Sequence, residues 1–194
     1  LDADKLNGRQ YTSHSESHSY FKGNVIYMST FSKTLAPGLR LGWIVAPASV
    51  IQHCVMAKQG MDLHTSSFVQ MVAYEVAKDG FLAEHVRQIR QVYRERRDIM
   101  LAAMAEFFPS EVRWTQPKGG LFLWVTLPEG MDSTAVLQQA IAHNVAFVPG
   151  ATFYPDNDQQ TNSFRLNFSN AREERIVEGI TRLGQVLKEM LVKA

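Results

Sequence analysis

A long amphipathic helix, predicted near the middle of the chain, constrains the fold more than any other feature of the sequence. Apolar residues recur at three- and four-residue steps over residues 81–107, and Pro109 ends the pattern. The helix divides the 194 residues into two segments, which are long enough for one domain and a fraction of a second. The apolar stripe consists of Val86, Ile89, Val92, Tyr93, Met100, Ala103, Met104 and Phe107.

The segment before this helix has an α/β pattern. Short apolar runs predict strands at residues 25–28 and 41–46, with an aperiodic stretch at 29–40 between them. Helices are expected over 49–58 and from Thr65 or Ser66 to about residue 78. Residues 1–23 have no apolar period and are expected to form a loop, in which His14 and His18 are solvated and bind no metal.

The segment after the helix has an α+β pattern. Strands are expected at 112–114, 121–125, 145–148 and 163–168, and helices at 133–143 and 171–192. Asn170 is expected to cap the last helix, with Glu173 three residues later as in a capping box. Alternation along 163–168 places Phe164, Leu166 and Phe168 on one face and Arg165 on the other.

Composition excludes several classes of protein. The chain is 45% hydrophobic and 20% charged with a net charge of +1, so nothing global points to a nucleic acid or an anionic membrane. The arginines of the long helix are interrupted by acidic residues and are expected to form a solvated face. Cys54 is the only cysteine, which favours a reducing compartment, and we expect a cytoplasmic protein.

Residues 29–42 combine groups with complementary chemistry. Thr30 and Ser32 supply hydroxyls, Lys33 an amine and Arg40 a guanidinium, with a turn at Pro37-Gly38. A lysine amine held at a strand end can form a Schiff base with an aldehyde. Hydroxyls and an arginine fork are suited to a phosphate. An aldehyde and a phosphate on one small molecule describe pyridoxal 5′-phosphate (PLP).

The same stretch resembles a signature of class I/II PLP-dependent aminotransferases, Ser/Thr-x-Ser-Lys-x-x-x-Pro-Gly-x-Arg-x-Gly. The resemblance implies that Lys33 carries the cofactor as a Schiff base and serves as the catalytic base. It also implies that Thr30, Ser32 and Arg40 hold the cofactor phosphate. Every fixed position is matched, by Thr30, Ser32, Lys33, Pro37, Gly38, Arg40 and Gly42.

Further segments extend the resemblance over nearly the whole chain after residue 24. Residues 117–124 are similar to the family's P-x-G-G-x-F-x-W segment, and residues 148–153 to its V-x-P-G-x-x-F segment, and both are interpreted as structural. The strand around Arg165 resembles the family's R-L-x-F strand, whose arginine binds the substrate α-carboxylate. Planar, bidentate pairing with a carboxylate is well suited to arginine. The nearest branch holds 2-aminoadipate and kynurenine aminotransferases and the aminotransferase-like domains of MocR-type regulators.

The resemblance implies an α/β chain, formed by the end of the fold-type I PLP-dependent transferase large domain plus a small α+β C-terminal domain. Residues 1–82 would be the truncated large domain and residues 83–194 the small domain. The family is usually dimeric, so a homodimer is expected for the parent protein. Its substrates would be an α-amino acid and a 2-oxo acid, between which the amino group is transferred.

Several family contacts to the cofactor ring have no counterpart in residues 1–23, so we expect the chain to be a fragment that is poorly active alone. Three alternatives remain open. The chain could belong to the PLP-binding effector domain of a MocR/GntR-type transcription regulator. It could come from a PLP lyase or decarboxylase on the same scaffold. It could also be a structural fragment with no bound cofactor.

Overall fold

The computed structural model describes residues 25–154 and 162–193. The loop expected over 1–23, with its two histidines, lies outside the described residues. The chain forms two compact units, Leu1–Ile89 and Arg90–Ala194, each described here by itself. Helix α4 (Phe81–Phe107) contributes turns to both units and has the bounds that the apolar stripe predicts. Within the described residues, no helix is long and apolar enough to cross a membrane.

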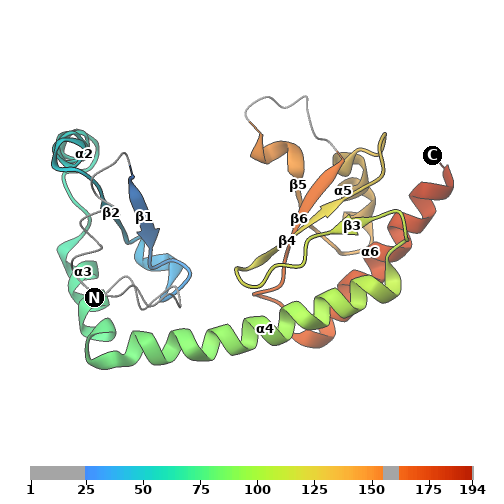
Figure 1. Cartoon of the computed structure of the whole chain (residues 1–194), viewed down its shortest axis with the longest axis horizontal. Helices are drawn as coiled ribbons and strands as arrows, with labels where there is room; N and C mark the ends of the chain where they lie inside the picture. The colour runs from blue at the N-terminus through green and yellow to red at the C-terminus, as the bar shows by residue number, and fades with distance from the viewer. Residues whose placement is uncertain (1–24, 155–161, 194) are drawn as a thin grey trace. The chain divides into compact units, whose positions relative to one another are not determined.

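The first unit is built on a pair of antiparallel strands. Strand β1 (Tyr27–Thr30) pairs with β2 (Gly42–Val45), and the register runs from Tyr27 opposite Val45 to Thr30 opposite Gly42. Each lies within two residues of its predicted position. The link between them holds the short 3-10 helix η2 (Pro37–Leu39). Helix α2 (Ala48–Met61), helix α3 (Ser67–Ala77) and the turn η3 (Lys78–Gly80) then lead into α4 (Figure 1).

The core of the first unit is small. Ala77, Leu82 and Val86 are buried together, and Phe31 and Leu35 pack against them from the β1–β2 link. Helix α2 buries none of its residues. Several large apolar side chains elsewhere in the unit are open to solvent, with Met61 84% and Phe68 77% exposed. In the described part of this unit, Phe31 and Leu35 therefore pack on a cluster formed by Ala77 at the end of α3 and by the start of α4.

The second unit has a four-stranded antiparallel sheet in the order β3-β4-β6-β5. Its strands are β3 (Arg113–Trp114), β4 (Phe122–Thr126), β5 (Val148–Pro149) and β6 (Ser163–Asn167). Helices α5 (Ser133–Ala142) and α6 (Glu173–Lys193) complete the unit, together with the 3-10 helix η4 (Gly150–Phe153) and the later turns of α4 (Figure 1).

The central strands of this sheet have two chemically different faces. Phe164 and Leu166 of β6 and Leu123 and Val125 of β4 are buried. They form one core with Met104 and other buried residues of α4, α5 and α6. The predicted alternation is confirmed, because Arg165 is on the opposite face and only half-buried. Burial of the apolar face fixes the register, since a slip of one residue would exchange the two faces.

Two predicted element boundaries were wrong. The strand expected over 145–148 is reduced to Val148–Pro149, because the Val145 N–H bonds Ala140 in the turn that ends α5. Helix α6 begins at Glu173, so Asn170 is not its cap. Instead the Asn167 side-chain oxygen accepts hydrogen bonds from the Ser169 N–H (2.7 Å) and hydroxyl (2.9 Å), which makes a turn of this segment.

Replacing Gly184 with alanine is expected to destabilise the second unit by about 1–3 kcal/mol. A Cβ at this position of α6 would lie 2.5 Å from the backbone oxygen of Phe107 in α4, so the two helices would have to move apart. Gly179→Ala is the matched control in the same helix, because a Cβ there meets nothing within 4 Å. That change should stabilise by roughly 0.5–1 kcal/mol. Urea unfolding followed by circular dichroism measures both, and equal effects would contradict the prediction.

Candidate functional site

Lys33 lies on a tight turn directly after β1. The N–H groups of Thr34, Leu35 and Ala36 all point to the carbonyl of Phe31, at 3.3, 2.8 and 3.1 Å. Phe31 and Leu35 pack on the small core of the first unit, and the Phe31 ring lies 4.8 Å from that of Trp43. Because the apolar residues on both sides are anchored, Lys33 is held on the exposed side of the turn.

The Thr30 hydroxyl organises the start of this turn. It lies 3.0 Å from the Ser32 N–H, which donates to it, and 2.8 Å from the Leu41 carbonyl, to which it donates. The Ser32 hydroxyl oxygen lies 2.9 Å from that of Thr30. Hydroxyl-to-backbone bonds of this kind mimic a backbone turn. One side chain therefore joins β1, the turn and the start of β2, and places two hydroxyls beside Lys33.

Arg40 closes the other end of the β1–β2 link. Its backbone is left-handed, with φ 52° and ψ 39°, and its N–H bonds the Pro37 carbonyl. The guanidinium also donates to the Pro37 carbonyl, at 2.9 Å. Within the described residues it has no ion-pair partner, so most of its N–H donors are free for a ligand.

The charged side chains in the sequence around the β1–β2 link are all basic. Residues 17–61 contain no aspartate or glutamate, although the chain has 19. The Lys33 amine has no hydrogen-bond or ion-pair partner among the described residues. The Arg40 guanidinium and the Ser32 hydroxyl supply donors that suit a phosphate monoester, and the Lys33 amine can attack an aldehyde. The Thr30 hydroxyl donates to the Leu41 carbonyl and can donate to a ligand only by giving up that bond. The residues present therefore fit a phosphorylated aldehyde such as PLP.

Arg165 lies in an aromatic cage in the second unit. Its guanidinium carbon is 3.9 Å from the centre of the Phe122 ring and 4.5 Å from that of Phe153, close enough for cation–π attraction. Trp124, directly opposite Arg165 in the sheet, packs edge-on against Phe153 with ring centres 5.5 Å apart. The guanidinium has no hydrogen-bond or ion-pair partner within the described residues. It is held in place while its donors are free, as bidentate carboxylate binding requires.

The predicted residues therefore fall into two groups. Thr30, Ser32, Lys33 and Arg40 belong to one β1–β2 link in the first unit, whereas Arg165 belongs to the second unit. Sequence reasoning missed Phe122 and Phe153, because it interpreted their segments as structural. Phe122 could have been found from the strand pairing. Trp124 lies opposite Arg165, and Phe122, two residues before Trp124, is on the same face of the sheet as both.

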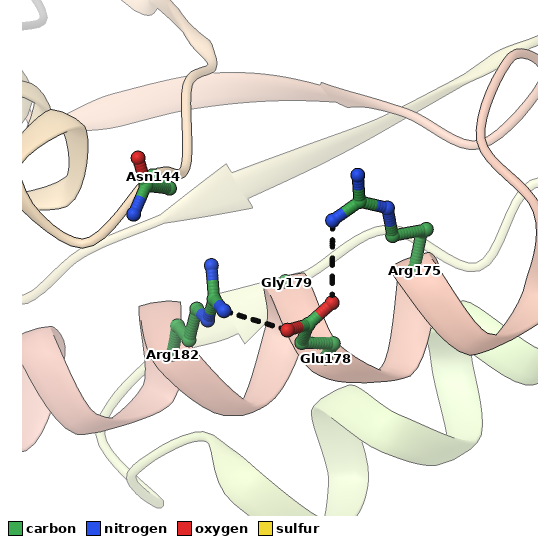
Figure 2. Close-up of a pocket in the computed structure, with 5 residues that line it drawn as sticks. All are labelled: Asn144, Arg175, Glu178, Gly179 and Arg182. Carbon is green, nitrogen blue, oxygen red and sulfur yellow. Dashed lines mark hydrogen bonds and ion pairs between the residues drawn. The ribbon is translucent and has the colours of Figure 1, made fainter.

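A third feature is a hollow of about 520 Å³ lined by Asn144, Arg175, Glu178, Gly179 and Arg182 (Figure 2). Glu178 pairs with Arg182 at 2.6 Å and with Arg175 at 3.6 Å. Ion pairs at these spacings are typical of a solvated helix face. None of the predicted site residues lines the hollow, and we assign it no function.

The chain belongs to the aminotransferase class I and II family, whose sequence profile matches residues 10–183. It is 47% identical over 172 residues to aromatic-amino-acid aminotransferase 1 of Thermococcus litoralis. It also resembles the crystal structure of LysN, an α-aminoadipate aminotransferase of Thermus thermophilus complexed with N-(5′-phosphopyridoxyl)-L-leucine. The TM-score with LysN is 0.88, at 40% identity over 97% of this chain. The described fold is accordingly that of part of a fold-type I PLP-dependent aminotransferase.

The matches cover this chain far better than they cover the relatives. The alignment with the Thermococcus litoralis enzyme takes in 89% of this chain but 41% of the relative, and that with LysN takes in 48% of LysN. The chain thus spans less than half the length of these proteins. An HTH-type transcriptional regulator of Bacillus subtilis, YdfD, is 33% identical over 87% of this chain and 34% of its own length.

Replacing Thr30 with valine is expected to speed hydrogen exchange of the Ser32 amide about fivefold to tenfold. Valine keeps the branched shape but removes the oxygen that this N–H bonds, and such a bond contributes about 1 kcal/mol. Thr30→Ser is the matched control, because it keeps the hydroxyl and should leave the rate unchanged. Exchange measured by NMR tests both, and an unchanged Ser32 rate in Thr30→Val would show that the hydroxyl does not organise the turn.

Proposed function

We propose that this chain carries the cofactor lysine and the substrate-carboxylate arginine of a PLP-dependent aminotransferase, which moves an amino group from an α-amino acid to a 2-oxo acid. The observation that carries the proposal is the free amine of Lys33 on a turn with two hydroxyls, in a segment without carboxylates. Membership of the aminotransferase class I and II family supports it. The names of several relatives, which are aromatic-amino-acid and 2-aminoadipate transaminases, also support it.

The proposed cofactor is PLP. Its ring, when bound, accepts the electron pair that is left on the substrate carbon as a proton departs. Thr30, Ser32 and Arg40 would hold the phosphate, and the Lys33 amine would condense with the aldehyde, whose oxygen would leave as water. The phosphopyridoxyl compound bound to LysN supports this choice of cofactor for a similar fold.

Each proposed residue has a separate task. The Lys33 Nζ would be the base that takes the proton from the substrate Cα and returns a proton. Arg165 binds the α-carboxylate through two parallel hydrogen bonds. Phe122 and Phe153 keep the guanidinium plane fixed, so that the carboxylate is bound in one orientation.

The chain would perform this reaction as part of a longer protein. It spans 41% of the Thermococcus litoralis enzyme, and the first unit exposes apolar side chains such as Met61, Leu63 and Phe68. Exposed apolar surface of this kind is typical of a face that packs against further polypeptide. We propose that residues outside these 194 complete the cofactor site. We also propose that residues 1–82 and 83–194 belong to a large and a small domain and that the protein is a homodimer, as the family resemblance implies. Its single cysteine favours the cytoplasm.

A regulator is the second candidate function. The similarity to YdfD favours it, because that relative is an HTH-type transcriptional regulator. In such a protein, a PLP-bound domain would signal the presence of a ligand instead of turning it over. The two functions differ in whether an added 2-oxo acid is converted to an amino acid by the full-length protein.

Borohydride reduction in the presence of PLP is expected to attach a pyridoxyl group to Lys33 and to no other lysine. Among the lysines of the described residues, Lys33 alone belongs to the β1–β2 link that carries the hydroxyls and Arg40. Peptide mass analysis reads the site, and Lys33→Ala is the control that should abolish labelling. Scattered labelling of the 194-residue chain would mean that further residues are needed to build the site. The same test on the full-length protein would then decide, and failure at Lys33 there would contradict the proposal.

Arg165→Lys in the full-length protein is expected to lower kcat/KM for the amino acid about 100-fold, or about 2.7 kcal/mol in transition-state binding. Lysine keeps the charge but cannot form the planar bidentate pair. Arg113→Lys on the edge strand β3 is the matched control, because Arg113 is exposed and has no partner within the described residues. Steady-state kinetics measure both, and equal kcat/KM values for the two variants would argue against a carboxylate role for Arg165.

A further inference from the structure

Two consecutive arginines of α4 contact the backbone beyond the ends of β4 and β6. Arg96 donates from Nη1 to the carbonyl of Ser169, and Arg97 donates from Nη1 to the carbonyl of Pro117 at 3.2 Å. Both arginines are half-buried, and the Arg97 side chain is only 17% exposed. This differs from the solvated face that the sequence predicts for the arginines of this helix.

The two bonded carbonyls border the strands that build the aromatic cage. Ser169 follows β6, four residues after Arg165, and Pro117 precedes β4, five residues before Phe122. A hydrogen bond of 3.2 Å from the Phe168 N–H to the Leu121 carbonyl joins the two strands at this same end. Arg96 and Arg97 therefore connect α4 to the end of the sheet near Phe122 and Arg165.

The positive charges of Arg96 and Arg97 strengthen their hydrogen bonds to the backbone carbonyls. The Arg97 guanidinium also pairs with Asp98 at 2.6 Å, whereas Arg96 has no carboxylate partner within the described residues. Hydrogen bonds from a charged donor are stronger than neutral ones. Arg94, on the same helix, is exposed and bonds nothing within the described residues, so it is a natural comparison.

We propose that Arg96 and Arg97 are positioning residues for the carboxylate site: they fix the ends of β4 and β6 so that the Arg165 guanidinium stays between its two rings. This rests on the proposed carboxylate role of Arg165. The ring contacts are close, at 3.9 and 4.5 Å, and a displacement of about 1 Å at a strand end would open them. Release of this end of the sheet would therefore weaken carboxylate binding without touching the guanidinium itself.

NMR of the 194-residue chain tests the proposal without cofactor or turnover. The Arg165 Nε–H signal, identified by its loss in Arg165→Lys, should be displaced by the currents of the two adjacent rings. In Arg96→Met and Arg97→Met, the chemical shift of this signal should move at least halfway to that of a free arginine. Arg96→Lys, which keeps the stem and one charged donor, should restore part of the displacement, and Arg94→Met should leave it unchanged.

A titration with 3-phenylpropionate, followed on the same signal, measures binding of a simple carboxylate. Its Kd should rise at least fivefold in Arg96→Met and stay the same in Arg94→Met. Backbone amide spectra confirm folding, and if Arg96→Met fails to fold, Arg97→Met and Arg96→Lys decide. If the Arg165 signal and the Kd are unchanged in the folded variants, the positioning role of Arg96 and Arg97 is overturned, and the proposed carboxylate role of Arg165 still stands. A wild-type chain whose ring-shifted Arg165 signal does not respond to the carboxylate would instead overturn the proposed function of Arg165.

Discussion

The antiparallel pairing of β4 with β6 is the interaction on which the second unit depends. One face of this pair supplies Leu123, Val125, Phe164 and Leu166 to the core, and the helices pack on it. The other face carries Arg165 and Phe122, and Phe153 of η4 packs against Arg165 there. Because alternation along a strand is strict, the apolar residues that hold the sheet in register also decide which side chains can form a binding site. Stability and the proposed recognition of a carboxylate thus share one constraint.

The first unit depends on a more local arrangement. The Thr30 hydroxyl, the Phe31 carbonyl and the apolar side chains of Phe31 and Leu35 fix the turn that carries Lys33. These groups lie within a few residues of one another, so a short sequence pattern is enough to specify the geometry. This explains why the lysine segment can be recognised from the sequence, although the unit around it buries only a small core of its own.

The accuracy of the sequence predictions follows the range of the interactions involved. The bounds of α4 and the two faces of β6 were predicted correctly, because each depends on the spacing of apolar residues along one element. The Asn170 cap was wrong, since Asn167 makes a competing turn. The cage around Arg165 and the bonds of Arg96 and Arg97 could not be predicted, because their partners are brought together only by strand pairing and by packing of α4. The family resemblance supplied Arg165 without supplying what surrounds it.

Phe122 and Phe153 shield Arg165 with rings, and no carboxylate of the described residues competes for it. An arginine held by an internal ion pair would have to exchange that partner for a ligand. Arg165 instead loses its rotameric freedom when the protein folds, and the N–H groups of its guanidinium stay open to a ligand. A carboxylate that arrives therefore meets a preorganised receptor, and its binding need not include the entropic cost of ordering the arginine.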